Sequence, residues 1–240
     1  MKIKKQYLKK IAGWLLPYTC IFCRSASPQQ RDLCEKCEKD LPLLANACPR
    51  CAVPMPENQP SLTCGFCLKQ APPFETAHAL FFYRPPIPEL ILALKFRHSL
   101  ANAKLLGELL TEKIKTEWYQ NKPLPSTIIP VPLHPKRLQE RGFNQALEIA
   151  RPIAHALKIP INHQTKRIKA TEAQATLSIS EREKNIRNAF STTENFSGQH
   201  IAVIDDVMTT GYTMKELSNT LKRQGADIID VWCCARPFLS

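Results

Sequence analysis

The sequence predicts an α/β protein with a mainly parallel sheet and flanking helices, preceded by a small segment that folds around metal ions. Three observations support this fold class. Eight of the ten cysteines form four Cys-x-x-Cys pairs before residue 70, apolar strand-like runs alternate with helical periodicity from residue 77 onward, and an apolar run at 201–204 ends in two acids. Strands that alternate with helices favour parallel pairing, because each crossover helix returns the chain to the same end of the sheet.

Length and composition fit this organisation. The 240 residues suffice for one domain of ordinary size with a smaller attachment, and a hydrophobic fraction of 44% supports a packed core. No apolar run reaches the roughly 18 to 20 residues that span a bilayer. Lysines precede a short apolar patch before Pro17, but no small-residue cleavage pattern follows, which disfavours an export signal. We therefore interpret residues 1–18 as a basic amphipathic helix and expect a cytoplasmic protein.

The charge is positive and unevenly spread. The formal net charge of +12 comes from 33 Lys and Arg against 21 Asp and Glu. Basic residues gather at the start of the chain and in a later segment: Lys2, Lys4, Lys5, Lys9, Lys10, Lys166, Arg167, Lys169, Arg182, Lys184 and Arg187. Such surfaces attract nucleic acid, nucleotides or acidic membrane lipid, so the N-terminal lysines could contact a membrane surface. The alternative is that these cations simply face water.

The cysteine spacing predicts two structural zinc ions. The pairs are Cys20 and Cys23, Cys34 and Cys37, Cys48 and Cys51, and Cys64 and Cys67. Two thiolates three positions apart can reach one Zn²⁺, and a second pair completes the tetrahedron. Sequential pairing gives two zinc ribbons, while an interleaved pairing of first with third is the other possibility. A disulfide framework or a redox motif is disfavoured, because no convincing export signal is present and the pairs lie in a proline-rich segment.

The remaining elements follow in order. Proline-rich joints at 71–74 and 84–86 bound a strand at 77–83, and apolar spacing over 87–120 indicates two helices broken near His98. A strand at 126–131, a helix at 141–157, a strand beginning at 160–162 and a helix at 180–189 with a capping box come next. A strand at 200–204, a helix from Thr213 to Gln224 and a strand at 227–235, whose Cys233 and Cys234 are core residues, complete the chain. The expected domains are 1–18, 19–72 and 73–240.

The segment 201–213 carries the strongest chemical signal. Asp205 and Asp206 at the carboxyl end of a parallel strand can accept hydrogen bonds from the vicinal hydroxyls of a ribose. The hydroxyl-rich loop that follows, with Gly211 and a helix N-terminus, can hold a phosphate. The alternative is a buried strand with solvated acids and an N-capping threonine.

The segment resembles the 5-phosphoribosyl-1-pyrophosphate (PRPP) motif of type I phosphoribosyltransferases. This resemblance implies that the two acids bind the ribose and that the 5-phosphate is surrounded by Val207, Met208, Thr209, Thr210, Gly211, Tyr212 and Thr213.

A second segment suits an anion. Residues 129–137 leave a strand into a loop rich in proline, where backbone N–H groups and two cations could neutralise a phosphate. In type I phosphoribosyltransferases the corresponding loop binds pyrophosphate, so the resemblance places that role, with Mg²⁺, on Leu133, His134, Lys136 and Arg137. A surface loop with two solvated cations is the competing interpretation.

The motifs together resemble the ComF family nearly end to end. They are the four cysteine pairs, Leu94-Lys95-Phe96-Arg97, Pro130-Val131-Pro132, Arg141-Gly142-Phe143-Asn144-Gln145, Thr171-x-x-Gln174-x-x-Leu177, Arg182-x-x-Asn185 and the PRPP motif. The resemblance implies a zinc ribbon joined to a phosphoribosyltransferase-like domain that handles single-stranded DNA in natural transformation or DNA utilisation, with competence proteins as partners. Members are often labelled amidophosphoribosyltransferases, but a shared fold does not establish a shared activity.

Two functions fit this resemblance. In the enzyme hypothesis, a nucleophile displaces pyrophosphate from Mg²⁺-PRPP, and Arg141 or Arg182 closes over the leaving group. In the binding hypothesis, the zinc ribbons, Phe143 and the basic residues around Arg187 grip single-stranded DNA, and PRPP is a regulator or a relic ligand. The acceptor of the transferred group cannot be identified from the sequence.

Overall fold

The computed structural model describes residues 18–29, 31–56, 62–170 and 185–238. The chain divides into two compact units, 1–41 and 42–240, which are described separately below. The expected basic helix at 1–18 lies outside the described residues except for Tyr18, as does the first half of the expected helix at 180–189. The described half is helical only at Asn185 and Ile186, and the chain turns at Arg187 and Asn188. Among the described residues, none of the helices combines the length and the apolar character that a membrane span requires.

The first unit is a small loop structure around four cysteines. Its helix α2 covers Glu35–Lys39, and an isolated antiparallel bridge joins Thr19 to Ala26. The hydroxyl of Ser27 donates a hydrogen bond of 2.7 Å to the carbonyl oxygen of Leu33. Leu33 and Cys20 are fully buried. With so few apolar side chains inside, this segment needs a metal to stabilise it.

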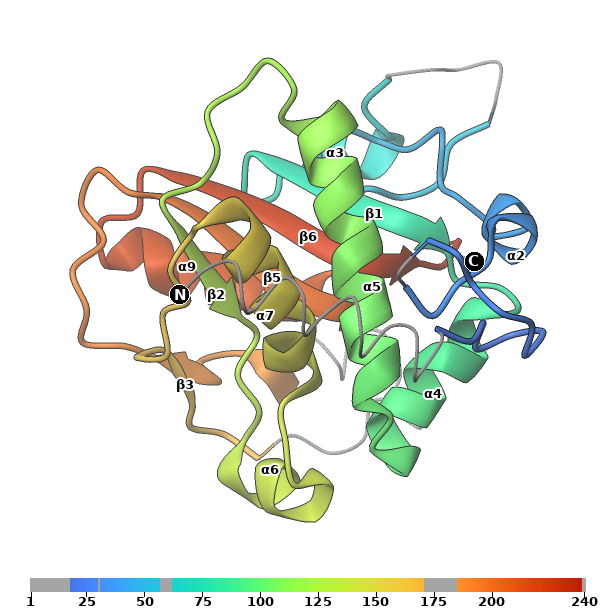
Figure 1. Cartoon of the computed structure of the whole chain (residues 1–240). Coiled ribbons are helices and arrows are strands. Elements are labelled where there is room, and N and C mark those ends of the chain that lie inside the picture. Colours follow the sequence, from blue (N-terminus) through green and yellow to red (C-terminus); the bar gives the residue numbers. More distant parts are fainter. Residues whose placement is uncertain (1–17, 30, 57–61, 171–184, 239–240) are drawn as a thin grey trace, which may run out of the picture. The chain divides into compact units, whose positions relative to one another are not determined.

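The second unit is built on a four-stranded sheet within the described residues (Figure 1). Its strands are β1 (Thr76–Phe82), β2 (Thr127–Pro130), β5 (His200–Val207) and β6 (Ile228–Arg236). Their order is β1-β6-β5-β2, and every pair is parallel, so the predicted mainly parallel α/β fold is confirmed. The short strands β3 (Lys166–Arg167) and β4 (Phe190–Ser191) pair antiparallel. The strand expected at 160–162 is reduced to one parallel bridge between Ile161 and Ile128.

Helices cover both faces of the sheet. In chain order they are α3 (Gly65–Lys69), α4 (Ile87–Arg97), α5 (Leu100–Lys113), the π-helical turn η1 (Ile114–Trp118), α6 (Pro135–Arg141), α7 (Gln145–Leu157) and α9 (Tyr212–Arg223). Helices α5 and α7 pack together over one face (Figure 1). On the other face, Met214 and Leu217 of α9 join the core cluster of Ile201 and Val203. Strands buried on both faces need continuous apolar runs, which explains the sequences of β5 and β6.

Two local features differ from the sequence-based expectation. The helix expected over 141–157 begins instead at Gln145, because α6 ends at Arg141, Gly142 takes a left-handed conformation with φ of 73°, and Asn144 caps α7. The Asn144 side chain accepts hydrogen bonds from the backbone N–H groups of Ala146 and Leu147. The segment expected as a loop through Arg137 instead enters α6 at Pro135, whose fixed φ and missing N–H suit a first helical position.

The chain from Pro42 onward, which carries the second four cysteines, packs against β1 at the edge of the sheet. The backbone N–H of Leu44 donates to the carbonyl oxygen of Leu80 at 2.9 Å, and that of Phe82 donates to Pro42 at 2.9 Å. Arg50 forms an ion pair of 3.3 Å with Glu75, just before β1. This cysteine segment therefore belongs to the same compact unit as the sheet.

Candidate functional site

The eight paired cysteines gather into two groups. Within each group the four Sγ atoms lie within 4.8 Å of one another, with Cys20, Cys23, Cys34 and Cys37 in one and Cys48, Cys51, Cys64 and Cys67 in the other. Sulfur atoms around a tetrahedral zinc at about 2.3 Å are separated by about 3.8 Å. The 3.6 Å separations of Cys23 from Cys34 and of Cys51 from Cys64 fit this geometry. The sequential pairing is confirmed, and the interleaved alternative is wrong.

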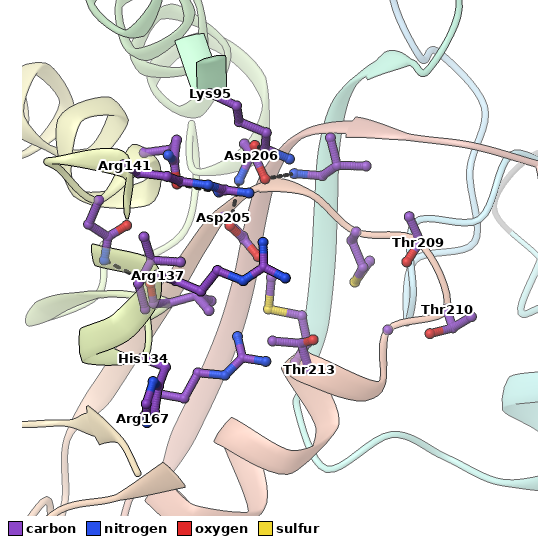
Figure 2. A pocket seen from close by; sticks show the side chains of 18 of the residues that line it. Lys95, His134, Arg137, Arg141, Arg167, Asp205, Asp206, Thr209, Thr210 and Thr213 are labelled. Atoms are coloured by element: carbon purple, nitrogen blue, oxygen red, sulfur yellow. Dashed lines mark hydrogen bonds and ion pairs between the residues drawn. The ribbon is translucent and has the colours of Figure 1, made fainter. Parts of the chain in front are cut away.

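The two predicted acids stand at the carboxyl end of β5 and line a cavity of about 450 Å³. Asp206 is 5% exposed, and its Oδ2 forms an ion pair of 2.6 Å with Nζ of Lys95 from α4 (Figure 2). The backbone N–H of Asp206 donates to Oδ1 of Asp205 at 2.9 Å, and that of Val207 donates to Oδ1 of Asp206 at 2.8 Å. Both carboxylates are thus held in fixed positions by their own strand end.

The surroundings shift the titration of this pair. Burial, followed by the neighbouring charge of Asp206, raises the pKa of Asp205 to about 7, and Lys95 opposes this shift. Burial alone lowers the pKa of Lys95, but the carboxylate of Asp206 outweighs it, so the pKa of Lys95 is raised. The lysine therefore stays charged, while Asp205 gains or loses its proton near neutral pH.

The acids at the end of β5 form one wall of the cavity, and the loop that follows them forms a second wall. Gly211 has φ of 81° and caps α9, which begins at Tyr212. A left-handed backbone of this kind favours glycine and turns the chain toward the cavity. Six of the seven predicted 5-phosphate residues line the cavity: Val207, Met208, Thr209, Thr210, Gly211 and Thr213. Tyr212 instead packs against the core cluster.

The third wall comes from the β2–α6 segment and from α6 itself. Of the predicted pyrophosphate residues, Leu133, His134 and Arg137 line the cavity, while Lys136 is exposed on α6. His134 accepts a hydrogen bond of 3.2 Å from the backbone N–H of Lys136 and so caps α6. Arg141 also lines the cavity and donates to Oε1 of Gln145 at 3.0 Å. In Figure 2, Arg137, Arg141 and Arg167 lie on one side of the acids and the threonines lie on the other.

The lining as a whole suits an anion that carries hydroxyl groups. Among the described residues, four cations (Lys95, Arg137, Arg141 and Arg167) and two carboxylates line the cavity, so the lining has a net charge of 4 − 2 = +2 when both acids are ionised. Cations attract phosphate groups, and carboxylates accept hydrogen bonds from hydroxyl groups.

The roles of Lys95 and Arg167 in this site were not predicted from the sequence. Lys95 follows the buried Leu94 on α4, so a lysine beside an apolar helix face was the available signal. Arg167 had been grouped with the exposed basic residues, yet it lines the cavity, and its guanidinium lies 5.6 Å from the ring centroid of Phe190. Arg182, predicted as a leaving-group contact, lies outside the described residues.

A buried arginine joins this site to the second cysteine group. Arg236, at the end of β6, is 2% exposed. Its Nη1 donates to the carbonyl oxygen of Met208 at 2.6 Å, and its Nε donates to that of Cys51 at 3.1 Å. One side chain therefore supports both the start of the loop that follows β5, at Met208, and the turn at Cys51 in the second cysteine group.

Comparisons with known proteins agree with these features. The double zinc ribbon domain matches residues 11–68, and the phosphoribosyl transferase domain matches residues 143–237. The chain is 36% identical over 224 residues to the DNA utilization protein YhgH of Salmonella typhi, covering 92% of this chain and 98% of that protein. It is 35% identical to Competence protein F of Haemophilus influenzae, covering 91% and 97%. A solved glutamine PRPP amidotransferase from B. subtilis aligns at 20% identity and a TM-score of 0.38, over 57% of this chain and 26% of that one.

These features define a double zinc ribbon protein with a phosphoribosyltransferase-type domain. The chain belongs to the family of DNA utilization and competence proteins that includes YhgH and Competence protein F.

Proposed function

We propose that this protein binds Mg²⁺-PRPP in the cavity at the end of β5 and acts in the cytoplasm in the handling of single-stranded DNA, during natural transformation or DNA utilisation. One observation carries the ligand assignment. The acid pair, the threonine loop and the cationic wall, which come from distant parts of the sequence, line the same cavity. The names of the relatives carry the assignment to DNA handling and competence.

Each part of PRPP has a matching wall. The 5-phosphate suits the segment Thr209–Thr213 at the start of α9, which brings a helix N-terminus and three threonines to the cavity. The ribose hydroxyls suit Asp205 and Asp206, and the pyrophosphate suits the wall of His134, Arg137 and Arg141. Bound Mg²⁺ would neutralise pyrophosphate oxygens at that wall.

As an enzyme, the protein would transfer the phosphoribosyl group. A nucleophile forms a bond to C1 of the sugar while the bond from C1 to the pyrophosphate oxygen breaks. Pyrophosphate leaves with the electron pair, and the proton of the nucleophile passes to water. Positive charge develops on the sugar and negative charge on the leaving group, so the carboxylates and the cationic wall each face the charge that they stabilise.

Calorimetry with Mg²⁺-PRPP tests the binding step. The Asp205→Asn/Asp206→Asn double variant loses two charge-assisted hydrogen bonds at about 1.5 to 3 kcal/mol each, so binding should weaken by a factor on the order of a hundred or more. Asp227→Asn, at an exposed acid, is the control and should bind as the parent does. Unchanged affinity in the double variant, with unchanged circular dichroism, would place the ligand elsewhere.

Pyrophosphate release separates catalysis from simple binding. The parent protein is incubated with PRPP and candidate acceptors, and pyrophosphate is measured over time. Steady release that disappears in the double variant supports the transferase. Stoichiometric PRPP binding without turnover supports a binding protein for which PRPP is a regulator.

A second cavity favours this DNA-binding alternative. It measures about 600 Å³, shares Arg167 with the first cavity, and is lined by Phe143, Arg151 and Lys166. The hydroxyl of Thr165 lines it too, is buried, and has no hydrogen-bond partner among the described residues. An aromatic ring with nearby cations is the usual combination for single-stranded nucleic acid.

Salt dependence tests that alternative. Arg151→Glu/Lys166→Glu should weaken oligothymidylate binding and lower the slope of log affinity against log salt by about 0.7 for each lost phosphate contact. Lys158→Glu/Lys169→Glu, at two exposed lysines that do not line the cavity, is the matched charge control. Equal binding of the first variant and the parent at every salt concentration would rule this cavity out as the DNA site.

A further inference from the structure

Helix α4 presents two large apolar side chains to the proposed phosphoribosyl cavity. Leu92 and Phe96 lie one turn apart, and both line the cavity that contains Asp205 and Asp206. They are 47% and 65% exposed, respectively. Side chains four positions apart share one face of a helix, so the two form a continuous apolar surface.

The position of this surface is fixed. Ile87, Ile91 and Leu94 are fully buried on the opposite side of α4 and set its rotation. The ion pair of 2.6 Å between Lys95 and Asp206 holds the helix beside the acids. The exposure of Leu92 and Phe96 is therefore a consequence of the packing of α4 and not of a frayed helix end.

Two further groups complete the surface. Tyr83 lines the same cavity from the end of β1, where its backbone N–H donates to the carbonyl oxygen of Arg236 at 3.0 Å. The guanidinium of Arg141 lies 5.7 Å from the ring centroid of Phe96. Aromatic rings and a guanidinium plane are surfaces on which a flat ring stacks.

We propose that Tyr83, Leu92 and Phe96 form the acceptor wall of the phosphoribosyl site, and that the acceptor carries a flat aromatic ring of the nucleobase type. The inference rests on the proposed function, because an acceptor must lie beside the sugar held by Asp205 and Asp206. Ammonia or a small amide would leave this apolar wall in water, whereas a ring laid on Phe96 removes the surface of both partners from water.

Product-like ligands test the wall without knowledge of the natural acceptor. Ribose 5-phosphate occupies only the sugar and phosphate positions, while AMP and UMP add a base at C1. Calorimetry on the full chain should find AMP on the order of ten-fold tighter than ribose 5-phosphate, because the base of AMP stacks on an aromatic ring and ribose 5-phosphate has no base. Phe96→Ala should bring AMP to the affinity of ribose 5-phosphate and leave the latter unchanged.

Controls separate stacking from a general loss of structure. Phe96→Trp keeps a ring and should retain tight AMP binding. Leu92→Ala should weaken AMP several-fold, whereas Leu100→Ala, which changes a comparably exposed leucine (52%) outside the cavity lining, should not. Fluorescence of 2-aminopurine riboside 5′-monophosphate should be quenched by the parent and by Phe96→Trp, but not by Phe96→Ala.

The outcomes distinguish this inference from the proposed function. Equal affinities of AMP, UMP and ribose 5-phosphate in the parent would overturn the acceptor wall and leave the phosphoribosyl site standing. Tighter AMP binding that survives in Phe96→Ala would also overturn it. If neither ribose 5-phosphate nor PRPP binds, the proposed function is wrong and the acceptor wall is wrong with it.

Discussion

At the scale of single residues, the contact between Lys95 and Asp206 determines the electrostatics of the candidate site. Asp206 is almost fully buried and pairs with a lysine from a helix more than a hundred positions earlier in the chain. A buried carboxylate is costly unless a counter-charge accompanies it. In the protein without a ligand, the ammonium group of Lys95 therefore supplies the counter-charge that Asp206 needs.

Removing that lysine should destabilise the fold. We expect Lys95→Met to lower the free energy of unfolding by about 3 kcal/mol, because the buried charge of Asp206 loses its partner. Lys104→Met is the control, since the ion pair of Lys104 with Glu108 is more exposed and such pairs are worth at most about 1 kcal/mol. Urea unfolding measures both. Equal losses in the two variants would show that the buried pair has no special role.

The protonation of Asp205 should control ligand affinity around neutral pH. Its pKa lies near 7 in the folded protein against an ordinary value of 3.8, so between these values the folded state keeps a proton that the unfolded chain has lost. In that window the contribution of Asp205 to stability falls as pH rises, and it is constant above about pH 8. Only the ionised carboxyl accepts ribose hydroxyls fully, so PRPP affinity should rise through pH 7.

Calorimetry from pH 5.5 to 8.5 measures this rise, and the Asp205→Asn variant reports the titration of PRPP alone. The gap in affinity between parent and variant should widen with pH. The variant should also be more stable than the parent at pH 8 and lose that advantage toward pH 4. A gap that stays constant over the range would mean that Asp205 is ionised throughout.

At the scale of elements, the packing of α5 on α7 depends on one glycine. A Cβ added to Gly107 would lie 2.5 Å from the carbonyl oxygen of Ile149 and closer still to Cγ of Pro152. Both obstacles belong to the rigid part of α7. The close approach of these two helices therefore requires the absence of a side chain at residue 107.

Gly107→Ala should lower the free energy of unfolding by about 2 kcal/mol, even though alanine favours a helix by about 1 kcal/mol. Gly65→Ala is the matched control, because a Cβ at this helical glycine has no heavy atom within 4 Å. Chemical denaturation compares the two variants with the parent. A Gly107→Ala protein as stable as the parent would show that α7 moves away at no cost.

The strands of the sheet could be predicted from the sequence, whereas their order could not. Strands at 77–83, 126–131, 200–204 and 227–235 correspond to β1, β2, β5 and β6, because strands covered on both faces require apolar runs. The start of α7 was predicted at Arg141 and lies at Gln145, and α6 was missed, because α6 buries none of its residues and so leaves no apolar pattern in the sequence. The contact of Lys95 with Asp206 and the order β1-β6-β5-β2 were beyond reach, because both depend on long-range packing.

At the scale of the whole molecule, the two zinc sites differ in their setting. The site of Cys20 lies in the compact unit 1–41, and the site of Cys48 lies in the unit that contains the sheet. Zinc analysis of protein purified without added metal should find close to two ions per chain. Cys20→Ser and Cys48→Ser should each reduce that value to about one, whereas values near zero in the parent would contradict both sites.

The second zinc site should also support ligand binding. Arg236 donates to the carbonyl oxygens of Cys51 and Met208, so the metal-binding turn and the proposed phosphate loop share one buried side chain. When the metal is lost the turn at Cys51 relaxes, and the loop at Met208 loses a fixed support. We expect Cys48→Ser to weaken ribose 5-phosphate binding about five-fold or more, a typical size for coupling between two sites.

Cys20→Ser is a matched comparison, because Cys20 and Cys48 are both fully buried thiols, each in a four-cysteine group. Its zinc content should fall by the same amount while ribose 5-phosphate affinity stays at the parent value. Arg236→Lys keeps the charge but cannot reach both carbonyl oxygens with separate N–H groups, so it should weaken binding with zinc content unchanged. If Cys48→Ser and Arg236→Lys bind ribose 5-phosphate as the parent does, the second zinc site only stabilises the fold and has no part in positioning the phosphate loop.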